Sequence, residues 1–520
     1  MAWFSPEPLL IPDIIAMNAE YLGTKDAAIV DGEAVTWAEF GDGTARFGNA
    51  LLGTGLGHGD RVIVLMTNSY EMFEAMFGII RAGLCAVPLN CSITDEAVVG
   101  MIEDSKARAV VASGEHIARI ESQRGSLGED VVSRLIGVGT VEAGWHDYAT
   151  LRDAAEPRPP RVAIAPGDEC NIIYSSGTTG LPKGIVHDHA CREAWGSELA
   201  VPLRYHAGAR TLCCLGLFSN ISWVAMLATM YAGGTIIIAR RFDVARCLET
   251  MQNQKITHTV MVPLQYQKLL EYEHFDRYDL SSLDAYMCCG SPLAVGLKRE
   301  IVERMPGDFI ELYGLTEGLI TILGPEDMLG KIDSVGRPSP GQRLAIIDDD
   351  DNLLPVGEAG EIVGHAPYMM AGYHANEAAN REATWQHPSG VRWLRTGDVG
   401  KLDEDGFLYL VDRKKDMILS GGQNVYPADI EAVLVEHDAV SEVAVVGVAH
   451  KKWGETPLAI VVATAGEHPD PEELVAWCNS RVGKQQRISG AILMKELPRN
   501  PNGKVLKREL RKQYADMELG

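Results

Sequence analysis

The first three hundred residues alternate short apolar runs with stretches in which apolar residues recur every three or four positions. The run RVIVLMTNS (61–69) predicts a buried strand with its exit turn, YEMFEAMFGIIRAG (70–83) predicts a helix that ends on Gly83, and CAVPLN predicts the next strand. The same rhythm returns in the segment with TLCCLGLF (211–218), WVAMLATMYAGG, TIIIA, DVARCLETMQNQ and THTVMVP. Strands that alternate with helices predict an α/β fold built on parallel sheets.

The pattern changes in the last third of the chain. QRLAIID, AGEIVGHA, RWLRTGD and GFLYLVD are short strand-like runs separated by Asp- and Gly-rich turns, which predicts an antiparallel barrel or sheet. After DRKKD (412–416) the pattern is helix, strand, strand, helix and polar tail, which predicts a compact α+β unit. We therefore expect a large N-terminal domain over residues 1–413 and a small C-terminal domain over residues 414–520.

Composition and charge narrow the function. The formal net charge is −24, so the chain has no basic surplus for nucleic acid or an acidic membrane surface. No apolar run approaches the roughly 18 residues that a membrane span needs. The N-terminal stretch MAWFSPEPLLIPDIIAM lacks the basic region of a signal peptide. We expect a cytoplasmic enzyme without a transmembrane segment, and the sequence leaves open whether it is a monomer or a homodimer.

The ten cysteines form no CxxC pair. Several lie in apolar strand-like runs, including the adjacent pairs Cys213-Cys214 and Cys288-Cys289. This placement is typical of small buried apolar residues in a reducing compartment, not of a disulfide framework or a metal site.

The loop YSSGTTGLPKG (174–184) is the strongest sign of chemistry. Its glycines allow several backbone N–H groups to turn toward one anion, while its hydroxyls and Lys183 add donors and a positive charge. It is not the usual P-loop, because Gly184 and not Ser or Thr follows the lysine. The alternative is a plain surface loop, but so many small polar residues between apolar strands cost entropy without a packing gain. The loop predicts a phosphate site.

Four further motifs are weak by themselves, and each could be purely structural. YGLTEG (313–318) offers an aromatic ring on which a nucleotide base could stack, a hydroxyl, and a carboxylate that could hold Mg²⁺. RTGD (395–398) and VDRKKD (411–416) place charged side chains beside turns, suited to ribose hydroxyls. PRNPNGKVLKREL places Lys504 on a Pro- and Gly-rich loop.

Taken together, these motifs resemble the adenylate-forming superfamily of acyl-CoA synthetases, firefly luciferase and the adenylation domains of peptide synthetases. The resemblance covers essentially the whole chain, and GGQNVYPADIE and KKWGETPLAIVV are similar to the acid–CoA ligase branch. It implies a large domain of stacked α/β sheets with a β-barrel-like subdomain, followed by a small mobile α+β domain.

The resemblance also implies nucleotide ligands. The β- and γ-phosphates of ATP would be held by Ser175, Ser176, Gly177, Thr178, Thr179, Gly180 and Lys183. The adenine site would be formed by Gly290, Ser291, Pro292 and Tyr313. Thr316 would bind the α-phosphate, and Glu317 would coordinate Mg²⁺. Asp398 would bind the ribose hydroxyls, with Arg413 beside it.

In the C-terminal part, the resemblance implies that Lys504 is the catalytic lysine and Lys415 the hinge. Gly421, Gly422 and Lys484 would face the coenzyme A tunnel. The implied reaction joins a carboxylic acid to ATP, giving acyl-AMP and pyrophosphate, and then transfers the acyl group to coenzyme A. Two alternatives stay open: transfer to a carrier-protein thiol or to oxygen, and a nucleotide-binding regulator that has lost catalysis.

The sequence departs from the family pattern at two places. GLFSN (216–220) stands where many members carry PLFH, so Ser219 and Asn220 replace the bulk of a histidine near the acyl carboxylate. GKQQ (483–486) stands where many carry YKxP, which makes thiol acceptance a weaker expectation than adenylation. The acyl pocket implied by the resemblance consists of Phe218, Ser219, Asn220, Trp223, Cys289, Gly314 and Leu319. Because these residues are apolar or small, we expect a hydrophobic acid, bulky near its carboxyl group.

One tempting pattern has a simpler interpretation. HDHA (187–190) looks like a metal-binding pair of histidines. Histidines two residues apart between a loop and a helix are more often a helix cap and a surface residue, and that is the expectation here.

Overall fold

The computed structural model describes residues 8–139, 142–175, 183–413, 416–420, 423–500, 503–515 and 517–519. Contacts between residues divide the chain into two compact units. The first comprises Met1–Ile332, Ser339–Gln342 and Ala366–Glu382; the second comprises Asp333–Pro338, Arg343–His365 and Ala383–Gly520. The domain boundary expected at residue 413 stays a prediction.

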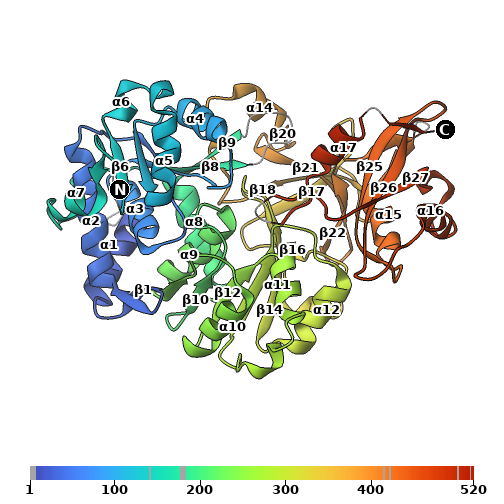
Figure 1. Cartoon of the computed structure of the whole chain (residues 1–520), viewed down its shortest axis with the longest axis horizontal. Helices are drawn as coiled ribbons and strands as arrows, with labels where there is room; N and C mark the ends of the chain where they lie inside the picture. The colour runs from blue at the N-terminus through green and yellow to red at the C-terminus, as the bar shows by residue number, and fades with distance from the viewer. Residues whose placement is uncertain are drawn as a thin grey trace. The chain divides into compact units, whose positions relative to one another are not determined.

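The first unit contains a long mixed sheet in which the strands follow the order β15-β14-β13-β12-β10-β11-β1-β2 (Figure 1). The run from β14 to β1 is parallel, as the alternation of strands and helices predicted. The strands are β1 (Asp26–Val30), β2 (Glu33–Thr36), β10 (Arg210–Cys213), β11 (Thr235–Ile238), β12 (His258–Met261), β13 (Ala285–Cys289), β14 (Asp308–Gly314) and β15 (Ile320–Leu323).

A second sheet of the first unit has the order β19-β9-β8-β4-β3-β5-β6-β7. Its strands are β3 (Arg61–Leu65), β4 (Cys85–Pro88), β5 (Ala109–Ser113), β6 (Leu135–Val138), β7 (His146–Asp147), β8 (Glu169–Ser175), β9 (Lys183–Asp188) and β19 (Gly372–Tyr373). Helix α8 (His189–Ala200) contacts β8 and β9, while α9 (Asn220–Tyr231) contacts β10, β11 and β12. Since the two helices pack on each other, they form a layer between the sheets (Figure 1).

Local sequence signals explain where helix α3 (Tyr70–Arg81) begins and ends. The hydroxyl of Ser69 accepts a hydrogen bond from the backbone N–H of Met72, which caps the first turn. The chain then leaves the helix through Gly83, whose φ of +66° favours glycine. The predicted helix over 70–83 is confirmed to within two residues.

The strand predicted over 211–218 is shorter than expected, because β10 ends at Cys213. Beyond it, the side chain of Asn68 replaces a neighbouring strand. Its amide donates to the carbonyls of Leu215 (2.8 Å) and Ala239 (3.0 Å), and its carbonyl accepts from the N–H of Leu217 (2.9 Å). A distant, buried asparagine therefore turns this segment into a fixed loop.

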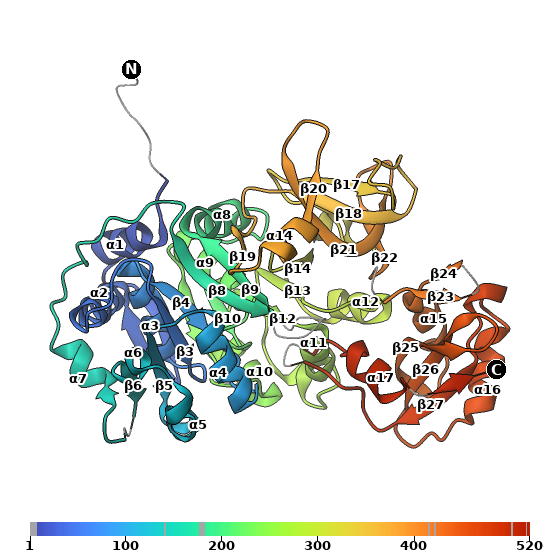
Figure 2. The same ribbon diagram turned by 90° about the horizontal axis from the view of Figure 1, so that it is seen from above.

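The second unit begins with an antiparallel sheet in the order β17-β18-β21-β20, with β22 paired to β21 (Figure 2). This confirms the antiparallel prediction. The strands are β17 (Arg343–Ile347), β18 (Gly360–His365), β20 (Thr384–Gln386), β21 (Arg392–Leu402) and β22 (Leu408–Arg413).

The C-terminal sheet has the order β24-β23-β26-β25-β28, with β27 paired to β26, and apolar residues cover both of its faces. Along β25, Val445 packs in the cluster that includes residues of α15 and α16, while Val446 packs in the cluster that includes Leu510 of α17. The predicted α+β unit is thus confirmed. Its elements are β23 (Ile418–Ser420), β24 (Gln423–Val425), α15 (Pro427–Leu434), β25 (Val440–His450), β26 (Gly454–Ala463), α16 (Pro471–Asn479), β27 (Gly490–Met494), α17 (Lys507–Gln513) and β28 (Glu518–Leu519).

The cysteines lie where the sequence placed them. Nine of the ten are buried and Cys91 is partly buried, with all ten as free thiols. Among the helices in the described part of the chain, none is both long and apolar enough to cross a membrane.

Candidate active site

The predicted substrate residues of the first unit gather at the carboxyl ends of the parallel strands. Strands β10 and β12 are neighbours, but the chain leaves β10 toward β11 on one side and returns to β12 on the other. Such a switch point opens a crevice at the carboxyl edge of an α/β sheet, where ligands bind. The segment 218–220 follows β10, the segment 290–292 follows β13, and Gly314 ends β14.

The loop after β13 packs closely against the start of α9. Gly290 has a φ of +91°, and a Cβ placed on it would lie 2.6 Å from Cδ1 of Ile221. Only glycine combines this backbone conformation with this approach. The adenine residues implied by the sequence therefore lie beside the helix that carries the implied acyl residues.

The implied acyl-pocket residues are mostly buried. Trp223 is fully buried; Ser219, Asn220, Cys289 and Leu319 are almost so. Phe218 is half-buried and Gly314 exposed. Within the described part of the chain, Oδ1 of Asn220 and Nε1 of Trp223 have no hydrogen-bond partner. Buried polar atoms are normally paired, so these two atoms are exceptions among the described residues.

The YGLTEG motif forms a tight turn after β14. The N–H of Leu315 donates to the carbonyl of Leu319, and the N–H of Gly318 donates back to the carbonyl of Leu315, both at 3.0 Å. Gly318 has a φ of +112°, and a Cβ there would lie 2.3 Å from the carbonyl oxygen of Tyr368. The turn leaves Tyr313, Thr316 and Glu317 half-buried.

Glu317 and Lys183 meet at a residue that the sequence analysis did not single out. The hydroxyl of Tyr373 donates to Oε1 of Glu317 at 2.9 Å, and Nζ of Lys183 lies 4.9 Å from the centre of the Tyr373 ring. Burial and the Glu317 carboxylate raise the pKa of Tyr373, so its phenol stays protonated. The implied phosphate-binding lysine and the implied metal ligand therefore share one aromatic residue.

A network of buried polar side chains is hydrogen-bonded to the backbone of Thr316. His187 Nε2 lies 2.8 Å from the carbonyl oxygen of Thr316, which can only accept, so this nitrogen carries the proton. Nδ1 of His187 therefore accepts from Nη2 of Arg192 at 3.2 Å, and Nε of Arg192 donates to Oδ1 of Asn171 at 2.7 Å. This hydrogen-bond network fixes one tautomer of His187 and the position of the Thr316 carbonyl.

Arg192 is fully buried, and two indole rings stabilise its charge. Its guanidinium lies 4.7 Å from the ring centre of Trp223 and 5.5 Å from that of Trp195. Burial lowers the pKa of Arg192 to about 10, so the group remains charged at neutral pH. The residue links the Thr316 turn to the tryptophan of the implied acyl pocket.

The interpretation of HDHA as a helix cap and a surface histidine is wrong. The side chain of Asp188 caps α8 by accepting from the N–H of Cys191 at 2.7 Å. Both His187 and His189 are fully buried, because β9 and α8 lie inside the layered first unit. The pattern of hydrophobic residues along the sequence does not show that a polar residue such as His187 or His189 is buried.

His189 should make the protein sensitive to mild acid. Burial lowers its pKa to about 4, although Asp168 opposes this and His58 adds to it. The unfolded chain therefore binds more protons than the folded one below pH 6.5, and stability falls as pH falls. Between pH 7 and pH 5 this residue should cost about 2 kcal/mol of unfolding free energy.

Urea unfolding of wild type and His189→Leu at the two pH values measures this cost. Within the described residues neither ring nitrogen of His189 has a hydrogen-bond partner, so leucine should be tolerated at pH 7. The variant should lose less stability than wild type at pH 5. Equal losses would show that His189 titrates normally.

In the second unit, the backbones of Asp398 and Arg413 are register partners in the pairing of β21 with β22. Asp398 is almost fully buried, and its N–H donates to the hydroxyl of Thr396 at 3.0 Å. This adjacency agrees with the pairing implied by the sequence, while the ribose role stays a prediction.

Lys504 lies on a loop in which two hydrogen bonds to Asn500 hold its backbone. Its N–H donates to Oδ1 of Asn500, and its carbonyl accepts from the N–H of Asn500, both at 2.9 Å. The lysine itself is half-buried. Lys484 is exposed in a short turn, where Gln486 donates to Asp429 at 2.9 Å.

Some predicted residues lie outside the described part of the chain: Ser176, Gly177, Thr178, Thr179, Gly180, Lys415, Gly421 and Gly422. Of Ser175 and Arg413 only the backbone is described. Near the adenine residues, Pro292 is exposed and the hydroxyl of Ser291 is buried without a partner among the described residues.

The layered α/β unit, the antiparallel sheet and the small C-terminal α+β sheet define an adenylate-forming enzyme. Residues 16–374 match the AMP-binding enzyme family, and residues 429–504 match the AMP-binding enzyme C-terminal domain. The chain belongs to the AMP-binding enzyme family, which is a family of AMP-forming ligases. Within this family it belongs with the acid–CoA ligases.

Known relatives and structures match nearly the whole chain. Feruloyl-CoA synthase of Amycolatopsis sp is 31% identical over 93% of this chain and 95% of that protein. A fatty acid–[acyl-carrier-protein] ligase, ScoC of Streptomyces coeruleorubidus, is 30% identical over 98% of this chain and 97% of that protein. The structure of o-succinylbenzoate CoA synthetase from Bacillus subtilis with its acyl-adenylate intermediate has a TM-score of 0.85 and 28% identity, covering 98% of this chain and 99% of that one.

Proposed function

We propose that the protein is an ATP-dependent carboxylic acid–CoA ligase. It converts an acid and ATP into acyl-AMP and pyrophosphate, and then converts acyl-AMP and coenzyme A into acyl-CoA and AMP. The observation that carries the proposal is the cluster of Lys183, Tyr373 and Glu317 beside the Thr316 turn. It brings a cation and a carboxylate to one aromatic residue beside the turn after β14, in a chain that belongs to a family of AMP-forming ligases.

Electrostatics explains the first step. A carboxylate is a poor nucleophile toward an anionic triphosphate, so positive groups must offset their repulsion. Lys183 and Lys504 supply fixed charges, and the phosphate loop supplies N–H donors. Glu317 fits a magnesium site, because one of its oxygens accepts from Tyr373 and a carboxylate has two. When bound, Mg²⁺ would neutralise the phosphate charge.

In the second step, the thiol of coenzyme A attacks the acyl carbon of acyl-AMP, so the groups around that carbon must differ from those of the first step. Acyl-AMP is a mixed anhydride that water would destroy, so the buried walls of the acid pocket protect it. We propose that rotation at Lys415 withdraws Lys504 and presents Gly421 and Gly422, which leave room for the pantetheine arm of coenzyme A. Lys484 would contact the coenzyme at the surface.

The acid is proposed to have a bulky hydrophobic body: fatty, aryl or cyclic. Trp223, Leu319 and Cys289 offer apolar surface, worth about 25 cal/mol per Å² buried. Ser219 is buried and small where a histidine is common in the family, which leaves space near the reacting carboxylate.

Ser219→His should therefore narrow the specificity. We expect kcat/KM for acids branched or ringed near the carboxyl group to fall about 10-fold or more, with a smaller loss for straight-chain acids. Paired specificity series on wild type, Ser219→His and the control Ser219→Ala measure this. An unchanged ratio in the histidine variant, or a wild type that prefers acetate, would contradict the pocket assignment.

A second candidate is transfer of the acyl group to a carrier-protein thiol, favoured by the similarity to ScoC and by Gly483 and Gln486, which replace family residues on the thiol side. A panel of acids assayed for AMP release with and without coenzyme A separates the two. Multiple-turnover AMP release that requires coenzyme A supports the ligase. Pyrophosphate release that stops after about one turnover with coenzyme A, together with AMP release that continues when a carrier protein is added, supports the second candidate.

A further inference from the structure

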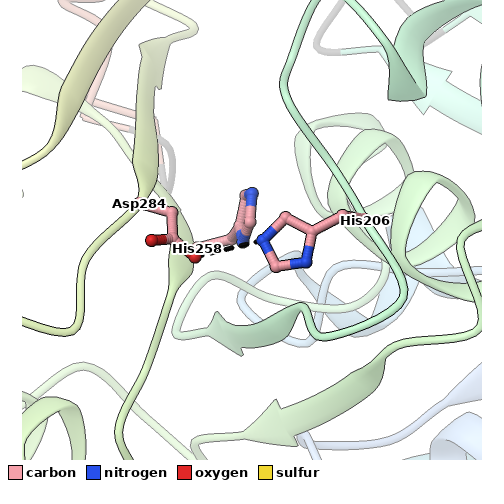
Figure 3. Close-up of side chains that lie close together, drawn as sticks. All are labelled: His206, His258 and Asp284. Carbon is pink, nitrogen blue, oxygen red and sulfur yellow. Dashed lines mark hydrogen bonds and ion pairs between the residues drawn. The ribbon is translucent and has the colours of Figure 1, made fainter.

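A cluster of two histidines and an aspartate lies at the opposite edge of the first unit's long sheet. His206 is on the loop before β10, His258 is the first residue of β12, and Asp284 directly precedes β13. These positions are the amino ends of neighbouring parallel strands, whereas the candidate active site lies at the carboxyl ends. Figure 3 shows the three side chains lying close together.

The three side chains have the geometry of a metal site. One ligand atom from each residue lies within 4.8 Å of the others. Nε2 of His206 is 3.1 Å from Oδ2 of Asp284, and the two imidazole rings are 5.4 Å apart (Figure 3). Ligand atoms around a tetrahedral Zn²⁺ lie about 3.3 Å apart. Small rotations of the two exposed side chains would close the remaining distance.

His258 is held rigidly as the central ligand. It is 1% exposed, its ring stacks on Tyr205 at 4.4 Å, and its Nδ1 lies 2.7 Å from the hydroxyl of Thr257. That hydroxyl can accept from Nδ1, since it also lies 3.4 Å from the carbonyl of Arg210, to which it can donate. Nε2 lies 3.1 Å from the carbonyl oxygen of Arg204, which can only accept, so this nitrogen carries the ring proton in this structure. Metal binding would move the ring proton to Nδ1, which then donates to the Thr257 hydroxyl, and would make Nε2 the ligand atom.

His206 and Asp284 are about half exposed, at 49% and 52%, so an ion can reach the cluster from solvent.

We propose that His206, His258 and Asp284 bind a Zn²⁺ ion, with water in the remaining position. Two imidazoles favour Zn²⁺ over Mg²⁺ or Ca²⁺, which prefer oxygen ligands. The site is separate from the magnesium site proposed at Glu317. Its effect is structural: the ion joins three separate segments at the amino edge of the sheet and stabilises the first unit.

Calorimetric titration of ZnCl₂ into the metal-free full-length protein, without ATP, tests the site. We expect one Zn²⁺ per chain, with affinity reduced at least about 10-fold in His206→Ala and in Asp284→Ala. His468→Ala removes another exposed histidine and should bind like wild type. Zn²⁺ should raise the midpoint of thermal unfolding in wild type and His468→Ala, but much less in the two ligand variants.

Co²⁺ reports which atoms bind. The site should give the visible bands of a nitrogen and oxygen site without a thiolate charge-transfer band, and the bands should be lost in His206→Ala. Absence of Zn²⁺ binding, equal binding by both ligand variants and wild type, or a thiolate band would each overturn the proposal. Because the readout is metal binding, none of these outcomes depends on the proposed ligase activity.

Discussion

Replacing Lys504 with alanine is expected to lower the rate of acyl-adenylate formation on the order of 10²–10³-fold. The positive charge stabilises the phosphates only while pyrophosphate leaves, so its loss acts on the transition state of the first step. The backbone of Lys504 is held by two hydrogen bonds to Asn500, which the alanine substitution keeps. The variant should therefore fold normally.

Two assays on the same preparation isolate this role. Pyrophosphate release measures the first step, and thioester formation from supplied acyl-AMP measures the second, which should stay within about threefold of wild type. Lys512→Ala removes an exposed lysine from the same C-terminal segment and is the matched control. If both steps fall equally in Lys504→Ala, the assigned role of the lysine in the first step alone is wrong.

Glu317→Gln should lower the rate of adenylation on the order of 10²-fold and raise the Mg²⁺ concentration needed for half-maximal rate. Glutamine keeps the shape of the side chain and an oxygen that can accept from Tyr373, but it removes the charge that a cation requires. The loss should thus reflect metal binding and not a collapsed turn.

Tyr373→Phe is the comparison for Glu317→Gln. It removes the hydroxyl that donates to Glu317 but keeps the ring beside Lys183. We expect a loss of only a few-fold, with a modest change in Mg²⁺ dependence. A Glu317→Gln variant with unchanged Mg²⁺ dependence would remove Glu317 from the metal site.

Much of the fold could be predicted from local patterns. Helix α3 has its capping serine, its apolar face and its final glycine within one short stretch. The apolar segment of β25 likewise predicted a strand, and the structure shows apolar cores on both sides of it. In such cases the information that specifies an element lies within the element.

The early end of β10 could not be predicted, because its cause is distant in sequence. Asn68 binds the backbone of residues 215 and 217 across about 150 positions of the chain. A run of apolar residues looks the same whether it is a strand or a buried loop. Only the tertiary structure decides between them.

In the candidate active site, too, some residues could be predicted from the local sequence and others could not. The motif residues Lys183, Thr316 and Glu317 were named from the sequence, but the residues that hold them were not. Tyr373 reaches Glu317 because β19 pairs with β9, and His187 reaches Thr316 through the interior of the unit. Supporting residues of this kind carry no motif of their own, since packing and hydrogen bonding select them.

The exchange of labelled pyrophosphate into ATP, measured without coenzyme A, tests the central claim most directly. Reversible formation of acyl-AMP predicts an exchange that requires a carboxylic acid and Mg²⁺ and that is lost in Lys504→Ala. The highest rates should come from bulky hydrophobic acids. Failure of every acid in a broad panel to support exchange, or cleavage of ATP to ADP in its place, would contradict the assignment of the protein as an acid-adenylating ligase.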